Sequence, residues 1–201
     1  MVTLYPYDKL GLANHGWLDA RHHFSFARYW NPDRTGFGKL LVINDDKVEA
    51  GKGFGAHPHD NMEIITYVRQ GAITHKDSMG NVKSLLTGQV QTMSAGTGLT
   101  HSEFNGSPDE EVHLYQMWIM PKTRGIEPRY HEWHPPKDIE DCKLYLIASP
   151  NGKDGSAEIN RDASLYLSYL KSGSSVKLPL NPERYGWLQI AVGEEIGRAH
   201  V

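Results

Sequence analysis

The feature that most limits the fold of this chain is the absence of long helical periodicity. Twenty glycines and eleven prolines are spread along its 201 residues, and its apolar runs are short. Residues 62–69 (MEIITYVR) instead alternate, with Ile64 and Thr66 on one face and Ile65 and Tyr67 on the other. Short runs of this kind between glycine-containing turns predict many strands joined by turns, as in a β-sandwich or a β-barrel.

The strand-like runs form two groups, which are separated by a proline-rich stretch at residues 121–136. We predict a first domain over residues 1–133 and a second, partial domain over residues 134–195, both all-β. The expected strands are 39–44, 62–69, 90–95 and 114–120 in the first domain, and 143–148, 165–170, 175–178 and 187–192 in the second.

The composition argues against several classes of function. Lysine and arginine number 21 against 24 aspartates and glutamates, so the formal net charge is −3 and no direct nucleic-acid binding is expected. The single cysteine, Cys142, cannot form an intrachain disulfide and fits a reducing compartment. We expect neither a signal peptide nor a membrane span, because no suitable apolar run is present. These features predict a cytoplasmic protein without membrane contact, which we expect to be a monomer.

Two short clusters carry the strongest chemical signal. HPH at residues 57–59 and HSE at residues 101–103 each place two metal-ligating side chains at positions i and i+2. Alternate residues of a strand point to the same face, so each cluster can aim two ligands into one interior. Three imidazoles and one carboxylate suit a divalent transition metal with open coordination positions. The sequence therefore predicts a metal site in a small β-barrel, formed by His57, His59, His101 and Glu103.

Two residues near these clusters bear on how the site is built. Pro58 lacks a backbone N–H, so its strand is predicted at the edge of a sheet or at a barrel mouth. Glu63 shares strand parity with His57 and His59 if the alternation continues. It then either faces the cavity, as an alternative ligand or as an outer partner of the ligands, or is a solvent-facing carboxylate, and the sequence leaves both interpretations open.

The end of the chain carries a separate expectation. Residues 187–192 are typical of a strand whose hairpin partner should follow, and a barrel closes only when its edge strands are paired. Residues 196–201 (IGRAHV) resemble the in-frame translation of a sequencing adapter. We expect a second barrel that is incomplete at its C-terminus, and a non-native tail at residues 196–201.

Six motifs in a fixed order resemble the pirin family, in particular its bacterial branch of quercetin 2,3-dioxygenase-like proteins. They are GWLDARHHFSFARYWNP (16–32), VINDD (42–46), GFGAHPHDNMEIITYV (53–68), HKDSMGN (75–81), MSAGTGLTHSEFN (93–105) and LYQMWIMP (114–121). The resemblance implies a bicupin, which is a tandem of two cupin β-barrels with the metal in the N-terminal barrel. It also implies that the ligands are His57, His59, His101 and Glu103.

Two details of the resemblance affect the assignment of residues. Compared with the general cupin pattern, the carboxylate ligand has moved from Glu63 to Glu103. His75 and Asp77 fall in the HxDSxG motif of the family, although a turn stabilised by aspartate and serine hydrogen bonds explains them equally well.

The resemblance further implies a function. We expect a dioxygenase that uses one divalent metal ion, with Fe favoured over Ni, Cu, Mn, Co or Zn. Its partners are a small, flavonol-like enolisable aromatic substrate and O2, with Glu103 as the general base for the substrate hydroxyl. The alternative from another class is a non-catalytic metal-binding protein that regulates a protein partner. That partner is a transcription factor or a metabolic enzyme, and the redox state of the metal controls it.

Overall fold

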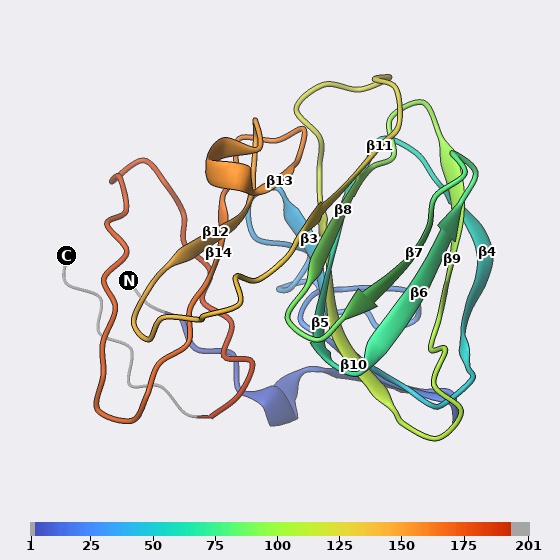
Figure 1. Cartoon of the computed structure of the whole chain (residues 1–201), viewed down its shortest axis with the longest axis horizontal. Helices are drawn as coiled ribbons and strands as arrows, with labels where there is room; N and C mark the ends of the chain where they lie inside the picture. Colours follow the sequence, from blue (N-terminus) through green and yellow to red (C-terminus); the bar gives the residue numbers. More distant parts are fainter. Residues whose placement is uncertain (1–2, 194–201) are drawn as a thin grey trace.

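The computed structural model describes residues 3–193, and strands make up almost all of its regular structure (Figure 1). Its helical segments are two three-residue 3₁₀ turns, η1 (Tyr7–Lys9) and η2 (Lys153–Gly155). Within the described residues, no helix is long and apolar enough to cross a membrane. The predicted all-β class is confirmed, whereas the predicted tail at residues 196–201 lies outside the described residues.

Two antiparallel sheets face each other in the first domain (Figure 1). The larger sheet has the strand order β1-β2-β3-β10-β5-β8-β11, and the smaller sheet has the order β4-β9-β6-β7. The strands of the larger sheet are β1 (Gly11–Asn14), β2 (Leu18–His22), β3 (Leu40–Val48), β5 (Glu63–Gln70), β8 (Val90–Ser94), β10 (Val112–Ile119) and β11 (Arg129–Trp133). Those of the smaller sheet are β4 (Gly53–His59), β6 (Ala72–Asp77), β7 (Val82–Leu86) and β9 (Leu99–Phe104). β4 is an edge strand, as Pro58 predicts.

The space between the two sheets is layered along each strand. On β5, Val68 belongs to one buried apolar cluster and Ile64 to another, while Thr66 lies between them. On β10, Leu114 and Trp118 belong to the same two clusters, with a glutamine between them. Side chains of one face repeat every second residue, so a polar layer results between two apolar ones. This layer is where the barrel can hold functional polar groups.

The second domain covers the outer face of the larger sheet. Its strands β12 (Tyr145–Ser149), β13 (Ala157–Glu158) and β14 (Leu165–Leu167) form a sheet of order β13-β12-β14. Ile147 and Tyr145 pack there against Ile65 of β5 and Trp133 of β11. Ile64 and Ile65 are both fully buried, so β5 is covered on both faces. This double burial explains why residues 62–69 are apolar on both faces of the alternation.

Most of the expected strands have counterparts in the structure, and two do not. Residues 39–44, 62–69, 90–95 and 114–120 correspond to β3, β5, β8 and β10, and the runs at 143–148 and 165–170 correspond to β12 and β14. The prediction of strands at 175–178 and 187–192 is wrong, because both stretches are irregular. Trp187 buries its ring against Phe24 and Phe37 at centroid distances of 5.2 and 5.6 Å, so side-chain packing replaces strand pairing. The division at residue 133 stays a prediction.

Candidate metal centre

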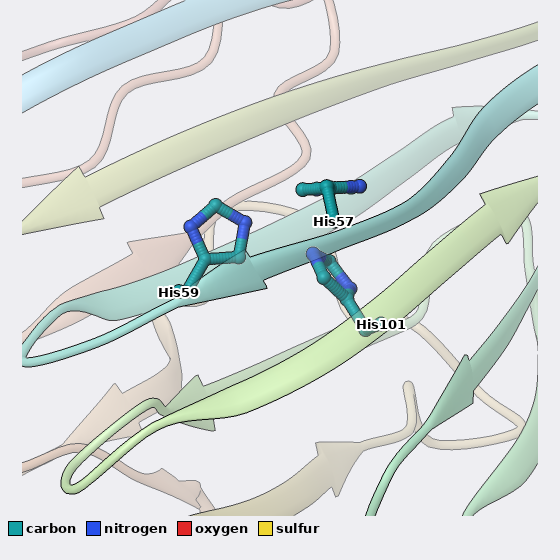
Figure 2. Close-up of side chains that lie close together, drawn as sticks. All are labelled: His57, His59 and His101. Carbon is teal, nitrogen blue, oxygen red and sulfur yellow. The ribbon is translucent and has the colours of Figure 1, made fainter.

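Three histidines from two neighbouring strands gather at one place in the smaller sheet (Figure 2). His57 and His59 are alternate residues of β4, and His101 lies on β9 directly opposite His57. The ring centroids of the three histidines lie 4.4 to 5.0 Å apart. One ring nitrogen from each lies within 4.8 Å of the other two, so the three are candidates to share one metal ion.

The backbone of β4 and β9 is shaped for this approach. A β-bulge lies between Phe54 and His57, and it adjusts the register so that His57 faces His101. Gly53 sits so close to β9 that an added Cβ would lie 2.2 Å from the carbonyl oxygen of Glu103. A side chain at position 53 would therefore push the two ligand-bearing strands apart.

Each of the three rings has a nitrogen available for a metal. His57 donates its Nδ1–H to the carbonyl oxygen of Gly55 at 2.7 Å, so its Nε2 carries the lone pair. The Nε2 atoms of His59 and His101 are buried and have no hydrogen-bond partner among residues 3–193. A buried polar atom without a partner is costly in a protein, and coordination of a metal ion would satisfy both nitrogens. The three imidazoles therefore fit a metal site.

Burial also keeps two of these rings neutral. Desolvation, followed by the neighbouring histidines, lowers the pKa of His101 to about 3. The pKa of His59 is lowered to about 4, chiefly by burial and then by His57. Only a neutral imidazole offers a lone pair to a metal, so both rings are in the ligating form at neutral pH.

Glu103, the fourth predicted ligand, lies in the polar layer inside the barrel. Its side chain is 2% exposed, and desolvation raises its pKa although hydrogen bonds to the carboxylate oppose this shift. Gln91 donates to Oε1 and Gln116 to Oε2, both at 2.8 Å, and Thr66 donates to Oε1 at 3.4 Å. The carboxylate is thus fixed in position by three side chains of the larger sheet.

Glu103 belongs to a second group of candidate ligands, which also contains His75 and His101. His101 is shared, so the two groups overlap and together contain all four predicted ligands. For His75 the sequence left two interpretations open, a family motif and a stabilised turn. Its side chain is fully buried and its Nδ1 lies 3.4 Å from Nδ1 of His101. The signal that would have found it is the spacing of His75 and Asp77, which is i and i+2 as in the other two clusters.

Both interpretations left open for Glu63 are wrong. Its side chain is fully buried, so it does not face solvent, and it points away from the histidines toward the second domain. Its Oε2 accepts hydrogen bonds from the Ser94 hydroxyl at 2.7 Å and from the backbone N–H of Asn160 at 2.8 Å. Burial raises the pKa of Glu63, while these two hydrogen bonds act in the opposite direction. Glu63 therefore anchors the second domain to the first.

The Glu63→Ala variant is expected to be less stable but unchanged in metal affinity. The substitution leaves the donors of Ser94 and Asn160 without their buried acceptor, which typically costs about 1–3 kcal/mol. Urea denaturation would measure the loss, and titration with nickel(II) would test the site. Weaker metal binding at undiminished stability would return Glu63 to the candidate ligands.

Two shallow surface hollows lie beside the histidine-bearing strands β4 and β9. One, of about 230 Å³, has His101 in its wall together with Asp77 and Lys76. The other, of about 320 Å³, has His59 in its wall together with Pro58 and Leu99. The Trp118 ring lies edge-on to His59 at a centroid distance of 4.9 Å and supplies an apolar surface on the inner side.

Two facing antiparallel sheets that carry inward-pointing histidines on adjacent strands define a cupin barrel with a candidate metal centre. The family model described as "Pirin" matches residues 6–119, more than half of the chain. A second model, described as "Quercetinase C-terminal cupin domain", matches residues 146–196. The chain belongs to the pirin family, and the expectation of two cupin domains in tandem is confirmed.

Relatives with assigned names support this membership. A protein of Escherichia coli (strain K12) named quercetin 2,3-dioxygenase is 48% identical over 194 residues, which are 96% of this chain and 82% of that protein. A pirin-like protein of Caulobacter vibrioides is 44% identical over 194 residues, covering 96% of this chain and 83% of its own.

Solved structures give the same result for the fold. The crystal structure of YhhW from Escherichia coli matches with a TM-score of 0.77 and 50% identity, covering 80% of this chain and 68% of that one. The bacterial pirin YhhW in complex with nickel(II) matches with a TM-score of 0.74 at the same identity and coverage.

Proposed function

We propose that this chain is a metal-dependent dioxygenase that acts on a flavonol-like, enolisable aromatic compound. The observation that carries the proposal is the convergence of three imidazoles, two of which have buried Nε2 atoms without a partner in the described part of the chain. Relatives named quercetin 2,3-dioxygenase supply the substrate class and the second substrate, O2.

The proposed ligands are His57, His59, His101 and Glu103, which together hold one divalent transition-metal ion. Three nitrogen donors and one oxygen donor, with no sulfur, suit Fe(II) or Ni(II). The family resemblance favours Fe, and the nickel(II) complex of the related YhhW supports Ni as the alternative. When bound, such an ion supplies Lewis acidity that lowers the pKa of a substrate hydroxyl group.

We assign to Glu103 the proton transfer from that hydroxyl group. Oε1 already accepts two hydrogen bonds, from Gln91 and Thr66, whereas Oε2 accepts one, from Gln116. Oε2 therefore has one free lone pair, which would bind the metal while Glu103 is a ligand and would take the proton once Glu103 is displaced from the metal. The amide groups of Gln91 and Gln116 hold the carboxylate still during the transfer, so that its orientation toward His101 is preserved.

Oxygen uptake with quercetin tests the proposal directly. The purified chain is loaded separately with Fe(II), Ni(II), Mn(II), Co(II), Cu(II) and Zn(II), and oxygen consumption and carbon monoxide release are measured. We expect both with at least one of the redox-capable or nickel forms, and neither with the metal-free protein. A chain that binds metal but consumes no oxygen with quercetin or related flavonols would contradict the dioxygenase assignment and leave metal binding intact.

A further inference from the structure

A line of buried hydrogen bonds runs from the β6–β7 turn to His101. His75 and Asp77 lie on β6, which pairs with β9 so that Asp77 is opposite His101. The Nε2 atom of His75 lies 3.0 Å from Oδ2 of Asp77, and both side chains are fully buried. The Nδ1 atom of His75 lies 3.4 Å from Nδ1 of His101, which is a long hydrogen bond.

The turn holds the Asp77 carboxylate in a single orientation. Oδ1 accepts the backbone N–H groups of Met79 at 2.9 Å and of Asn81 at 3.0 Å. Oδ2 accepts the side-chain amide of Asn81 at 2.8 Å as well as the ring of His75. Each carboxylate oxygen therefore has a defined set of donors, and His75 is one of them.

This arrangement determines where the ring protons lie. An ionised carboxylate can only accept, so His75 donates its Nε2–H to Asp77. When this is the single proton of the His75 ring, its lone pair is on Nδ1, where it accepts the Nδ1–H of His101. The remaining nitrogen of His101, Nε2, then carries a lone pair, and it is the buried atom without a partner among residues 3–193.

We propose that Asp77, acting through His75, fixes the tautomer of His101 that presents Nε2 to the metal. His75 and Asp77 are positioning residues, since their contacts are with a ligand and not with the ion. The proposal rests on the proposed metal site, in which His101 is a ligand, because the tautomer matters only if Nε2 coordinates. Outer partners of this kind commonly set the tautomer and orientation of metal-binding histidines.

The Asp77→Asn variant reverses this line of hydrogen bonds when the side-chain amide of Asn81, which donates to Oδ2 in the wild type, turns over so that its oxygen accepts from the new NH2 group. Two backbone N–H groups face position Oδ1, so the amide oxygen of the asparagine stays there and its NH2 group takes the position of Oδ2. This NH2 donates to Nε2 of His75, which moves the His75 proton to Nδ1. His101 must then accept on Nδ1 and carry its own proton on Nε2, where it blocks coordination.

The tautomer can be read in the metal-free protein by NMR of ¹⁵N-labelled histidines. We expect the Nδ1–H form of His101 in the wild type and the Nε2–H form in Asp77→Asn. Identical tautomers in the two proteins would overturn the proposal. This measurement needs no metal, so a failure of the proposed metal site would show separately, as a wild-type chain that binds no nickel(II).

Titration with nickel(II) supplies the second measurement. Asp77→Asn is expected to bind about 10- to 100-fold more weakly than the wild type, as is usual when an outer partner of a ligand is lost. Asn81→Ala, which removes one hydrogen bond from the same turn and keeps the His75 contact, should bind as the wild type does. In a His75→Phe background, Asp77→Asn should have no further effect. If Asn81→Ala lost as much nickel(II) affinity as Asp77→Asn, the proposal would be overturned in favour of a purely structural turn. The same conclusion would follow if Asp77→Asn lowered the affinity equally in the wild-type and His75→Phe backgrounds.

Discussion

Replacing His101 with alanine is expected to abolish metal binding and, with it, oxygen uptake with quercetin. His101 is the residue shared by the two groups of candidate ligands, so its loss leaves two members in each. His57, His59 and Glu103 of the four proposed ligands would remain, but neither of the two groups of converging ligand atoms in the described residues keeps three members without His101. Protein metal sites with an open position generally keep at least three protein ligands. The expected loss of affinity therefore exceeds the roughly 10- to 100-fold cost of removing an outer partner.

A matched control separates this effect from general damage to the barrel. His23 is as buried as His101, with 4% and 2% exposure, but its ring packs against Trp187 and its Nδ1 lies 3.1 Å from the carbonyl oxygen of Ile43. His23→Gln should keep its metal. Metal content by mass spectrometry and the free energy of unfolding would be measured for both variants. If His101→Ala retained metal at the wild-type affinity, the proposed ligand set would be wrong.

The strands could be predicted from the sequence where buried side chains alternate along the chain as the two faces of a strand do. Residues 62–69 alternate, and both faces are buried in the structure, one inside the barrel and one beneath the second domain. The strand prediction from alternation fails at residues 187–192. There the chain packs Trp187 against aromatic rings but does not pair with a neighbouring strand. Periodicity reports which side chains are buried, but strand pairing depends on a neighbouring backbone that a local pattern does not specify.

The candidate site could be predicted in part for a similar reason. The i, i+2 spacing placed two ligands on β4 and two on β9, and antiparallel pairing of these strands brings His57 opposite His101. The expectation that Glu63 shares a face with His57 and His59 is wrong because the alternation of side chains along a strand does not continue through a turn. β4 ends at His59, β5 begins at Glu63, and Asn61 between them has a positive φ of 45°. The chain reverses there, so Glu63 faces away from the histidines.

The residues that surround Glu103 could not be predicted from local sequence. Gln91 and Gln116 lie on β8 and β10 of the opposite sheet, and each reaches Glu103 only because the barrel closes. Although β8, β9 and β10 follow one another in the sequence, no spacing rule within a strand says which residues of three different strands meet. Their contribution depends on tertiary structure, as does the contact between His75 and His101.

Asp46 is expected to make the free energy of unfolding depend strongly on pH. It lies on β3 in the barrel interior with 4% exposure, and its Oδ1 is buried without a partner among the described residues. Burial, together with the nearby carboxylates of Asp45 and Glu103, raises its pKa to about 8 from an ordinary value of 3.8. The folded chain therefore holds a proton on Asp46 at neutral pH, whereas the unfolded chain does not.

The sign of the pH effect follows from this difference in bound protons. Between the unfolded and the folded pKa, the folded state binds one more proton, so the free energy of unfolding falls as the pH rises, by about 1.4 kcal/mol per pH unit. Asp46→Asn keeps the shape and removes the titration, so its stability advantage over the wild type should widen from pH 5 to pH 8 and then level off. Urea denaturation of the metal-free proteins across this range measures the widening, with the exposed Asp33→Asn as a control that should run parallel to the wild type. Parallel curves for Asp46→Asn as well would mean that the Asp46 carboxylate is ionised in the folded barrel and that an ordered partner compensates for its burial.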